Sequence, residues 1–236
     1  MDALPRLHSG DVTASNRIEA PPLLAGDRLS RTEFERRYHA HPEIKKAELI
    51  EGIVYMPSPV TYGRHADPHH CLVTWTGVYR AATPGVEAAD NATVRLDNEN
   101  EVQPDILLRI DRSRGGRSFV GPDDYLVGAP ELVVEIAASS ANYDMHVKRR
   151  VYARNGVQEY MVALMFDRVL HWYALEEGAY AEMQPSADGV LRSQVFPGLW
   201  LRPDAFWANE LAAMLATVQA GIASPEHQQF VVQLAA

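Results

Sequence analysis

The sequence has a single cysteine, no long apolar run and no continuous basic surface pattern. Cys71 alone excludes an internal disulfide and any zinc site built from several cysteines. No apolar stretch approaches the roughly 20 residues needed to cross a bilayer. The opening residues, MDALPRLHSGDVTASNRIEA, lack the apolar core of a secretory signal. We therefore expect a protein of the reducing cytoplasm that has no membrane partner.

Positive charge is scarce overall, because 22 Lys and Arg residues face 31 Asp and Glu residues and leave a net charge of −9. Basic surface drives nucleic-acid binding, so this total argues against such a partner. The charge is uneven, however. Segments 109–117 and 144–154 each carry +3, so the remainder of the chain carries −15. We expect two basic patches on an acidic body, and two solvated faces are the simpler alternative.

The periodicity of the remaining residues predicts an α/β protein with a mixed sheet flanked by helices and an added antiparallel meander. The domain organisation that we expect is a flexible N-terminal arm (1–28), a main domain (29–203) and a C-terminal helical extension (204–236) packed on the domain or between subunits. The elements that we predict are a helix from Ser30 to before Pro42, a hairpin about Glu51-Gly52, a helix at 64–82, strands at 86–96, 102–110 and 131–137, a helix from Ser139 or Ser140 to Asn155, a strand pair from Glu159 onward, a meander to about residue 202, and helices at 205–219 and from Ser224.

Two carboxylates lie inside apolar strand patterns, where a carboxylate is costly. Asp105 lies in VQPDILLRI and Glu135 lies in LVVEIA. An ionised carboxylate in such surroundings needs a metal, a cation or hydrogen bonds to compensate its burial. On neighbouring strands the two would form an oxygen site suited to Mg²⁺, which takes one or two protein carboxylates and keeps several waters. The alternative for each residue is a strand-end carboxylate or a structural ion pair.

Lys148 follows these carboxylates on the next predicted helix. It lies four residues after Asp144, so an ordinary (i, i+4) ion pair on a solvated face is the simpler interpretation. The functional interpretation places its ammonium beside the metal, where it would orient the attacking water or neutralise charge on a phosphate. Glu48 could approach the same metal from the hairpin. His65, His69 and His70 indicate a polar helix face rather than a zinc site.

Blocks of sequence from Glu48 to about Trp207 follow the order and spacing of a bacterial family. These blocks are Glu48-Leu49-Ile50-Glu51-Gly52, Met56-Pro57-Ser58-Pro59, His65, Val94-Arg95-Leu96-Asp97, Pro104-Asp105, Gly128-Ala129-Pro130-Glu131-Leu132-Val133-Val134-Glu135, Ser139, Asp144, Lys148, Tyr152, Gly156-Val157-Gln158-Glu159-Tyr160 and Phe196-Pro197-Gly198-Leu199. They cover about two-thirds of the chain. The stretch resembles the Uma-type restriction endonuclease family, a branch of the PD-(D/E)XK nuclease superfamily.

The resemblance implies a restriction-endonuclease-like fold in which Asp105 and Glu135 bind the metal together with the backbone carbonyl of Ile136. The lysine of the superfamily usually lies two residues after the acid, where this chain has Ala137, and the Uma-type pattern replaces it with Lys148. His65 matches a family position near the site. Relatives usually read Tyr-Trp followed by an Asp after this helix, whereas here Met161 follows Tyr160.

Three functions remain open from the sequence. The first is a Mg²⁺-dependent endonuclease, with Mn²⁺ as a substitute, in which Arg112, Arg114 and Arg149 bind phosphates and nucleic acid is held weakly. We expect a homodimer in that case, because cutting both strands of a duplex requires two sites. The second is an inactive binding module with the same fold. The third is a metal-dependent hydrolase of a small phosphorylated substrate, which a narrow pocket would favour.

Overall fold

Six strands form the central sheet of the computed structural model, which describes residues 20–236. Their order is β12-β11-β10-β9-β6-β3. The bounds are β3 Val86–Asp90, β6 Ile106–Ile110, β9 Leu132–Ala137, β10 Glu159–Leu164, β11 Val169–Glu176 and β12 Ala179–Glu182. Only the β9–β10 pair is parallel among these neighbours. A parallel pair requires a crossover connection, and the helical segment between β9 and β10 provides it.

A second sheet of six short strands has the order β2-β1-β5-β4-β8-β7. Its strands are β1 Glu48–Ile50, β2 Ile53–Tyr55, β4 Val94–Arg95, β5 Glu101–Val102, β7 Phe119–Val120 and β8 Leu126–Val127. The hairpin at Glu51-Gly52 is confirmed, but the strands predicted at 86–96 and 102–110 each divide between the two sheets. Asn91 has a φ of +52°, which ends β3, and Pro104 lacks the N–H that a continuous strand would use.

The predicted helices form, and two of them begin with or contain π-helical turns. Ser30 caps α1 (Arg31–Ala40) by accepting a hydrogen bond from the backbone N–H of Glu33. The π-turn η1 (Tyr62–Ala66) leads into α2 (Asp67–Ala82). The crossover consists of α3 (Ala141–Tyr143), the π-turn η3 (Asp144–Lys148) and α4 (Arg149–Asn155). Gly156 ends it in the left-handed conformation, as predicted. A short 3₁₀ turn, η2, spans Arg112–Arg114.

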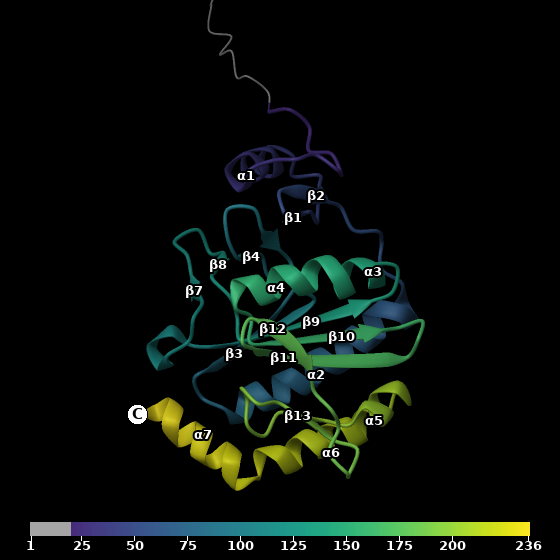
Figure 1. The fold of residues 1–236 in the computed structure, drawn as a ribbon, viewed down its shortest axis with the longest axis vertical. Helices are drawn as coiled ribbons and strands as arrows, with labels where there is room; N and C mark the ends of the chain where they lie inside the picture. The colour runs from purple at the N-terminus through teal and green to yellow at the C-terminus, as the bar shows by residue number, and fades with distance from the viewer. Residues whose placement is uncertain (1–19) are drawn as a thin grey trace, which may run out of the picture.

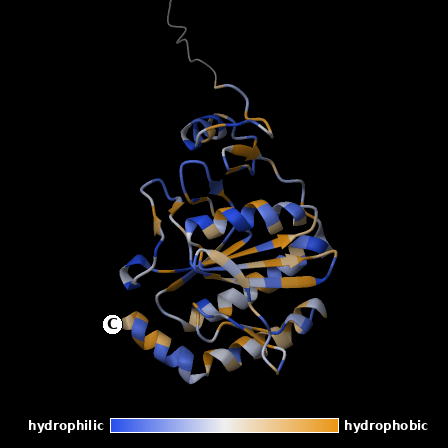
Figure 2. Ribbon diagram, in the orientation of Figure 1, coloured by the Kyte–Doolittle hydropathy of each residue, from blue (hydrophilic) through white to orange (hydrophobic). Residues whose placement is uncertain are grey.

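Helices cover both faces of the central sheet (Figure 1), whose strands are mainly apolar (Figure 2). One face packs against α2 and the C-terminal helices, and its core includes Trp75, Leu108, Val134 and Phe206. The other face packs against α4, and its core includes Leu107, Val133, Val151, Tyr152 and Tyr160. Alternate residues of β6 and β9 therefore belong to opposite cores, as the period of two along a strand requires.

The C-terminal part differs from the prediction in two ways. The strands β13 (Leu191–Arg192) and β14 (Trp200–Leu201) pair only with each other, so the meander ends at β12. The helix predicted at 205–219 is divided into α5 (Pro203–Trp207) and α6 (Leu211–Ile222), because Asn209 adopts a φ of +58° between them. The helix α7 (Pro225–Ala235) begins at the Ser224 cap as predicted.

The predicted flexible arm, 1–28, falls partly outside the described residues, and its described part is attached to the second sheet. Leu23 is 3% exposed and packs with Phe34 and Val54. The backbone N–H of Gly26 donates to Val54, and Arg28 forms a bridge with Ile53. Burial of Leu23 and backbone pairing therefore attach this described part to the second sheet, and the domain boundary at residue 28 stays a prediction. No helix within residues 20–236 has the length and apolar character that a membrane span requires.

We predict that Gly221→Ala destabilises the attachment of the C-terminal helices. A Cβ at Gly221 would overlap the carbonyl oxygen of Gly198 and lie 2.8 Å from Cγ of Trp200. Overpacking of this kind costs about 1–3 kcal/mol of unfolding free energy, measurable by urea denaturation. Gly77→Ala is the matched control in α2, because nothing lies within 4 Å of its Cβ. It should stabilise the protein by about 0.4–1 kcal/mol. Equal stabilities of the two variants would contradict the prediction.

Candidate active site

Asp105 and Glu135 lie opposite each other on the adjacent inner strands β6 and β9, at the end of the sheet where β6 begins. The register pairs Ile106 with Val134 and Leu107 with Val133, and one further step brings Asp105 opposite Glu135. Leu107 and Val133 belong to the core beneath α4. Because side chains alternate along a strand, the two carboxylates point to that same face. The structure thus brings together the two acidic residues that the sequence analysis selected.

Backbone and imidazole groups hold Asp105 in place. Its Oδ2 accepts a hydrogen bond from the backbone N–H of Ile136 at 2.8 Å. Its Oδ1 lies 3.5 Å from Nε2 of His65. Nδ1 of the same imidazole lies 3.3 Å from the carbonyl oxygen of Ile136. His69 lies 3.0 Å from the carbonyl oxygen of Asp105 and stacks on His65. His65 therefore spans two of the predicted metal ligands, the Asp105 carboxylate and the Ile136 carbonyl.

Lys148 lies among the carboxylates. Its Nζ donates to Oε1 of Glu135 at 3.0 Å and lies 3.1 Å from Oε1 of Glu48 and 3.8 Å from Oδ1 of Asp144. All four side chains are at most 5% exposed. Tyr152 donates from its hydroxyl to Oε1 of Glu135 at 2.7 Å. The predicted (i, i+4) ion pair of Lys148 with Asp144 forms, but it does not lie on a solvated face, because the crossover buries this side of η3 and α4 against the sheet.

Glu48 reaches the cluster from the second sheet. It begins β1, and its Oε1 also accepts a hydrogen bond from the backbone N–H of Gln103 at 2.7 Å. The carboxylate is 5% exposed. The hairpin therefore contributes a second buried acidic group within 3.1 Å of Nζ of Lys148. The site is formed where the two sheets meet the crossover.

The cluster holds four buried carboxylates and one buried ammonium, and Lys46 adds a partly exposed ammonium 3.9 Å from Oδ1 of Asp105. Burial raises the pKa of Glu135, Asp105 and Asp144 raise it further, and Lys148 opposes the shift. Burial alone would lower the pKa of Lys148, but the fields of Glu135, Glu48 and Asp144 raise it well above its usual value. Lys148 therefore keeps its proton, and a further cation bound beside Glu135 would stabilise the ionised form of that carboxyl.

The oxygen atoms available in the cluster fit a divalent cation. Within residues 20–236, Oε2 of Glu135 accepts no hydrogen bond, because Lys148 and Tyr152 both use the other oxygen. Oδ1 of Asp105 lies 3.5 Å from Nε2 of His65 and 3.9 Å from Nζ of Lys46. The hydroxyl of Tyr143 is buried and has no hydrogen-bond partner within the same range. In this range no three His, Cys, Asp or Glu side chains could hold a metal by themselves. Two carboxylates and a carbonyl are nevertheless a donor set that Mg²⁺ accepts.

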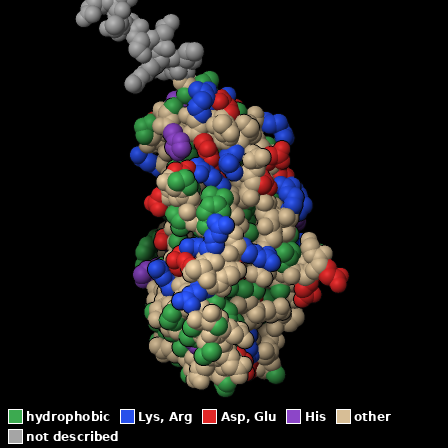
Figure 3. Space-filling view, turned by 90° about the vertical axis from the view of Figure 1, so that its left-hand side faces the viewer, with side chains coloured by type: hydrophobic (Ala, Val, Ile, Leu, Met, Phe, Trp, Pro, Cys, Tyr) green, Lys and Arg blue, Asp and Glu red, His purple; other side chains and the backbone are tan. Residues whose placement is uncertain are grey.

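The predicted phosphate-binding arginines lie apart from this cluster. Seven residues of largely extended chain, about 20 Å, separate Asp105 from Arg112 along β6. Arg112 stacks over Phe119, and Arg114 donates to the carbonyl oxygen of Leu234. On the face that carries β7, basic side chains are interspersed with acidic ones (Figure 3). Arg149 follows Lys148 but stacks over Tyr173 of β11. The structure therefore does not bring these three arginines to the carboxylates.

Three residues contribute to the site in ways that the sequence did not predict, namely Asp144, Tyr152 and His69. Asp144 was expected only as an exposed partner of Lys148 and Tyr152 only as a matching family position, although the spacing of four residues on either side of Lys148 places both on its helical face. His69 was assigned to a polar helix face together with His65, whereas both imidazoles point toward the Asp105 segment. The (i, i+4) spacing was the available signal. What the histidines contact depends on packing between elements distant in the sequence.

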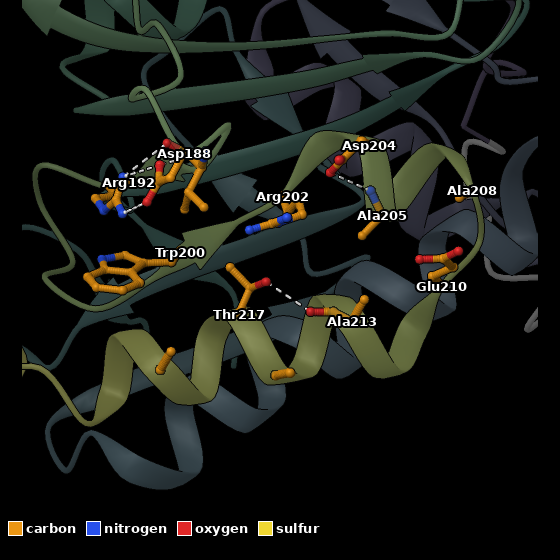
Figure 4. A pocket seen from close by; sticks show the side chains of 13 residues that line it. Asp188, Arg192, Trp200, Arg202, Asp204, Ala205, Ala208, Glu210, Ala213 and Thr217 are labelled. Atoms are coloured by element: carbon orange, nitrogen blue, oxygen red, sulfur yellow. Dashed lines mark hydrogen bonds and ion pairs between the residues drawn. The ribbon is translucent and has the colours of Figure 1, made fainter.

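A hollow of the structure lies elsewhere, between β13–β14 and α6 (Figure 4). It has a volume of about 640 Å³, and its walls include Arg192, Trp200 and Arg202 opposite the small residues of α6. A second hollow of about 300 Å³ lies between β3 and β8 and is lined by Arg109 and Tyr125. Neither contains Asp105, Glu135 or Lys148. The candidate site is therefore a buried charged cluster at the N-terminal end of β6 rather than part of either hollow.

The structure is thus an α/β protein with a mixed sheet, a buried Asp–Glu–Lys cluster and a helical crossover over the face that carries the cluster. Residues 31–205 match the model of the Uma2 family, described as "Putative restriction endonuclease", and the chain belongs to this family. The family and fold that the sequence predicted are thus confirmed.

One solved structure shows how far the fold extends. It is the crystal structure of a protein described as a putative nuclease belonging to DUF820 from Anabaena variabilis ATCC 29413. The similarity has a TM-score of 0.53 at 15% sequence identity and covers 80% of this chain and 99% of the other. At that identity the likeness shows the fold alone. No curated protein matches the sequence significantly.

Proposed function

We propose that this protein is a Mg²⁺-dependent endonuclease that hydrolyses phosphodiester bonds of nucleic acid. The observation that carries the proposal is the buried cluster at the N-terminal end of β6. In this cluster Asp105 and Glu135 share one face of the sheet, and Lys148 donates to Glu135 at 3.0 Å. Charged groups are rarely buried in such number without a function. Membership of the Uma2 family supports the same activity.

In this proposal Asp105, Glu135 and the carbonyl of Ile136 hold Mg²⁺. The bound ion would polarise the phosphodiester and lower the pKa of its bound water. Lys148, which is not a ligand, places a positive charge beside the reacting phosphate and stabilises the charge that develops there. Tyr152 and Glu48 fix the orientations of Glu135 and Lys148 through hydrogen bonds and ion pairing. His65 positions the Asp105 carboxylate and the Ile136 carbonyl relative to each other.

The test is cleavage of labelled single-stranded and duplex DNA and of RNA by the purified wild-type protein. We expect cleavage with Mg²⁺ or Mn²⁺ and none with EDTA. Absence of cleavage with every substrate and both metals would contradict the proposed function and favour a binding module.

The burial of the cluster favours a second candidate, a hydrolase of small phosphorylated substrates. Asp105 and Glu135 are 5% and 3% exposed, so a small molecule would reach them with less rearrangement than a polynucleotide. The same assay distinguishes the two with bis(4-nitrophenyl) phosphate. Turnover of this diester without cleavage of any nucleic acid would select the second candidate.

We predict weak nucleic-acid binding that depends only shallowly on salt. Each neutralised phosphate contributes a slope of about −0.9 in log K against log salt on duplex DNA, and few basic groups are available. Arg112→Ala combined with Arg114→Ala should weaken binding about equally for all sequences, as expected of phosphate contacts. Fluorescence anisotropy at several salt concentrations measures this. Arg36→Ala is the control, because Arg36 pairs with Glu33 on α1. An unchanged slope in the double variant would remove this loop from the binding surface.

A further inference from the structure

An exposed aromatic side chain, Phe166, meets an arginine next to the cluster, and Tyr62 lies two residues before that arginine in the π-turn η1. Tyr62 and Phe166 are 78% and 61% exposed, and Val60 is 64% exposed. The guanidinium of Arg64 lies 4.5 Å from the centroid of the Phe166 ring. Large exposed apolar groups that gather on a surface indicate an interaction site more often than chance exposure does. The group formed by Tyr62, Arg64 and Phe166 is called the stacking surface below.

The stacking surface adjoins the candidate site on both chain segments that form it. Arg64 directly precedes His65, whose imidazole lies 3.5 Å from Oδ1 of Asp105. On the other segment, Val162 of β10 pairs with Glu135 of β9, and Phe166 follows four residues later. The backbone N–H of Met165 donates to the carbonyl oxygen of Ala137, so the chain remains beside the end of β9 up to Phe166.

The charge of the stacking surface suits an anionic partner. Within residues 20–236, the side chain of Arg64 forms no ion pair and no hydrogen bond. Its guanidinium makes a cation–π contact with the Phe166 ring. Arg168 lies over the ring of Trp207 and donates to the Trp207 carbonyl oxygen. Asp167, between Phe166 and Arg168, is the one acidic residue of that turn. An unpaired guanidinium over an exposed ring can meet both a phosphate and the face of a base.

We propose that the stacking surface binds unpaired bases of a nucleic-acid strand whose backbone enters the site at Asp105 and Glu135. This inference rests on the proposed function and names its substrate class: nucleic acid with single-stranded nucleotides beside the scissile phosphate. Single-stranded binding combines aromatic side chains, on which bases stack, with basic groups that follow the backbone. Bases inside an intact duplex are already stacked on each other, so they leave no face for Phe166 or Tyr62.

The test compares binding of a single-stranded oligonucleotide and a blunt duplex in metal-free buffer, where no cleavage occurs. Alanine substitution of an aromatic side chain on which a base stacks weakens binding about five- to a hundredfold. We expect Phe166→Ala to show this loss for the single strand and less than a twofold change for the duplex. Phe166→Trp should restore the affinity, and its added fluorescence should be quenched when the single strand binds.

The pair Arg112–Phe119 provides the matched control, because its guanidinium also lies 4.5 Å from the ring centroid. Phe119 lies beyond the other end of β6 from the carboxylates. Phe119→Leu should leave the ratio of single-strand to duplex affinity unchanged, because a loss of phosphate contacts through Arg112 weakens both equally, and Phe119→Trp should report no quenching. Circular dichroism melting confirms that each variant is folded.

The outcomes distinguish this inference from the proposed function. A Phe166→Ala variant could bind single strands and cleave them with metal like the wild type. That result would overturn the proposal that the stacking surface binds bases and would leave the endonuclease proposal standing. An equal fall in the ratio of single-strand to duplex affinity for the Phe166 and Phe119 variants would overturn it as well. A wild-type protein that binds neither oligonucleotide and cleaves nothing would contradict both proposals, and the exposed rings would then indicate an apolar protein partner.

Discussion

Replacement of Lys148 by Gln is expected to reduce metal-dependent cleavage by about 10²–10³-fold, the usual effect of removing one group that stabilises transition-state charge. The ammonium lies among Glu135, Glu48 and Asp144 and is 5% exposed. No solvent cation can replace it there at low cost. Divalent-metal affinity should be retained or increased in this variant, because Lys148 is not a ligand and its positive charge opposes the cation.

Glutamine suits this test better than alanine because its amide can still donate to Glu135. Removal of one partner of a buried ion pair costs about 3–5 kcal/mol of stability, so unfolding by urea must be measured alongside activity. Lys148→Ala provides the second variant, and it should abolish cleavage with metal binding largely intact. Lys45→Gln is the control, since its Nζ bonds only to the Pro42 carbonyl oxygen in the described structure. Wild-type turnover in a folded Lys148→Gln protein would remove this lysine from the mechanism.

Replacement of Asp105 by Asn should weaken Mn²⁺ binding by at least about 100-fold, since loss of an outer partner of a metal ligand alone costs about 10–100-fold. The amide oxygen can still accept the hydrogen bond from Ile136 that Oδ2 accepts in the wild type. The change therefore removes the negative charge while keeping the local backbone contact. Isothermal titration calorimetry with Mn²⁺ measures the affinity, and cleavage should fall below detection in parallel.

Glu135→Gln tests the same site from the opposite strand and should have an effect of similar size. Asp188→Asn is the matched control, because this exposed carboxylate pairs with Arg192 far from the sheet edge. If Asp105→Asn and Glu135→Gln both bind Mn²⁺ like the wild type, the metal is not held between these strands. If only one of them loses binding, the ion is held by that carboxylate and the Ile136 carbonyl rather than by the pair.

The sequence determined the elements whose patterns are local. The alternation and length of LVVEIA predicted β9, the Ser30 cap predicted the start of α1, and Gly156 marked the end of the crossover, because caps and periodicities act over a few residues. The sequence also singled out Asp105 and Glu135. A carboxylate inside an apolar strand is conspicuous without any knowledge of its neighbours, since its burial is costly wherever the strand lies.

Only the tertiary structure decided which residues surround these carboxylates. Glu48 comes from another sheet, Lys148 from a crossover and His65 from a π-turn, and contacts over such sequence separations depend on how the sheets and helices pack. The same packing separated Arg112 from the site, although the two are close in sequence, because a strand extends the chain by about 3.3 Å per residue. Local pattern selects an element and its buried face. The position of that face relative to other elements is set by the burial of both cores at once.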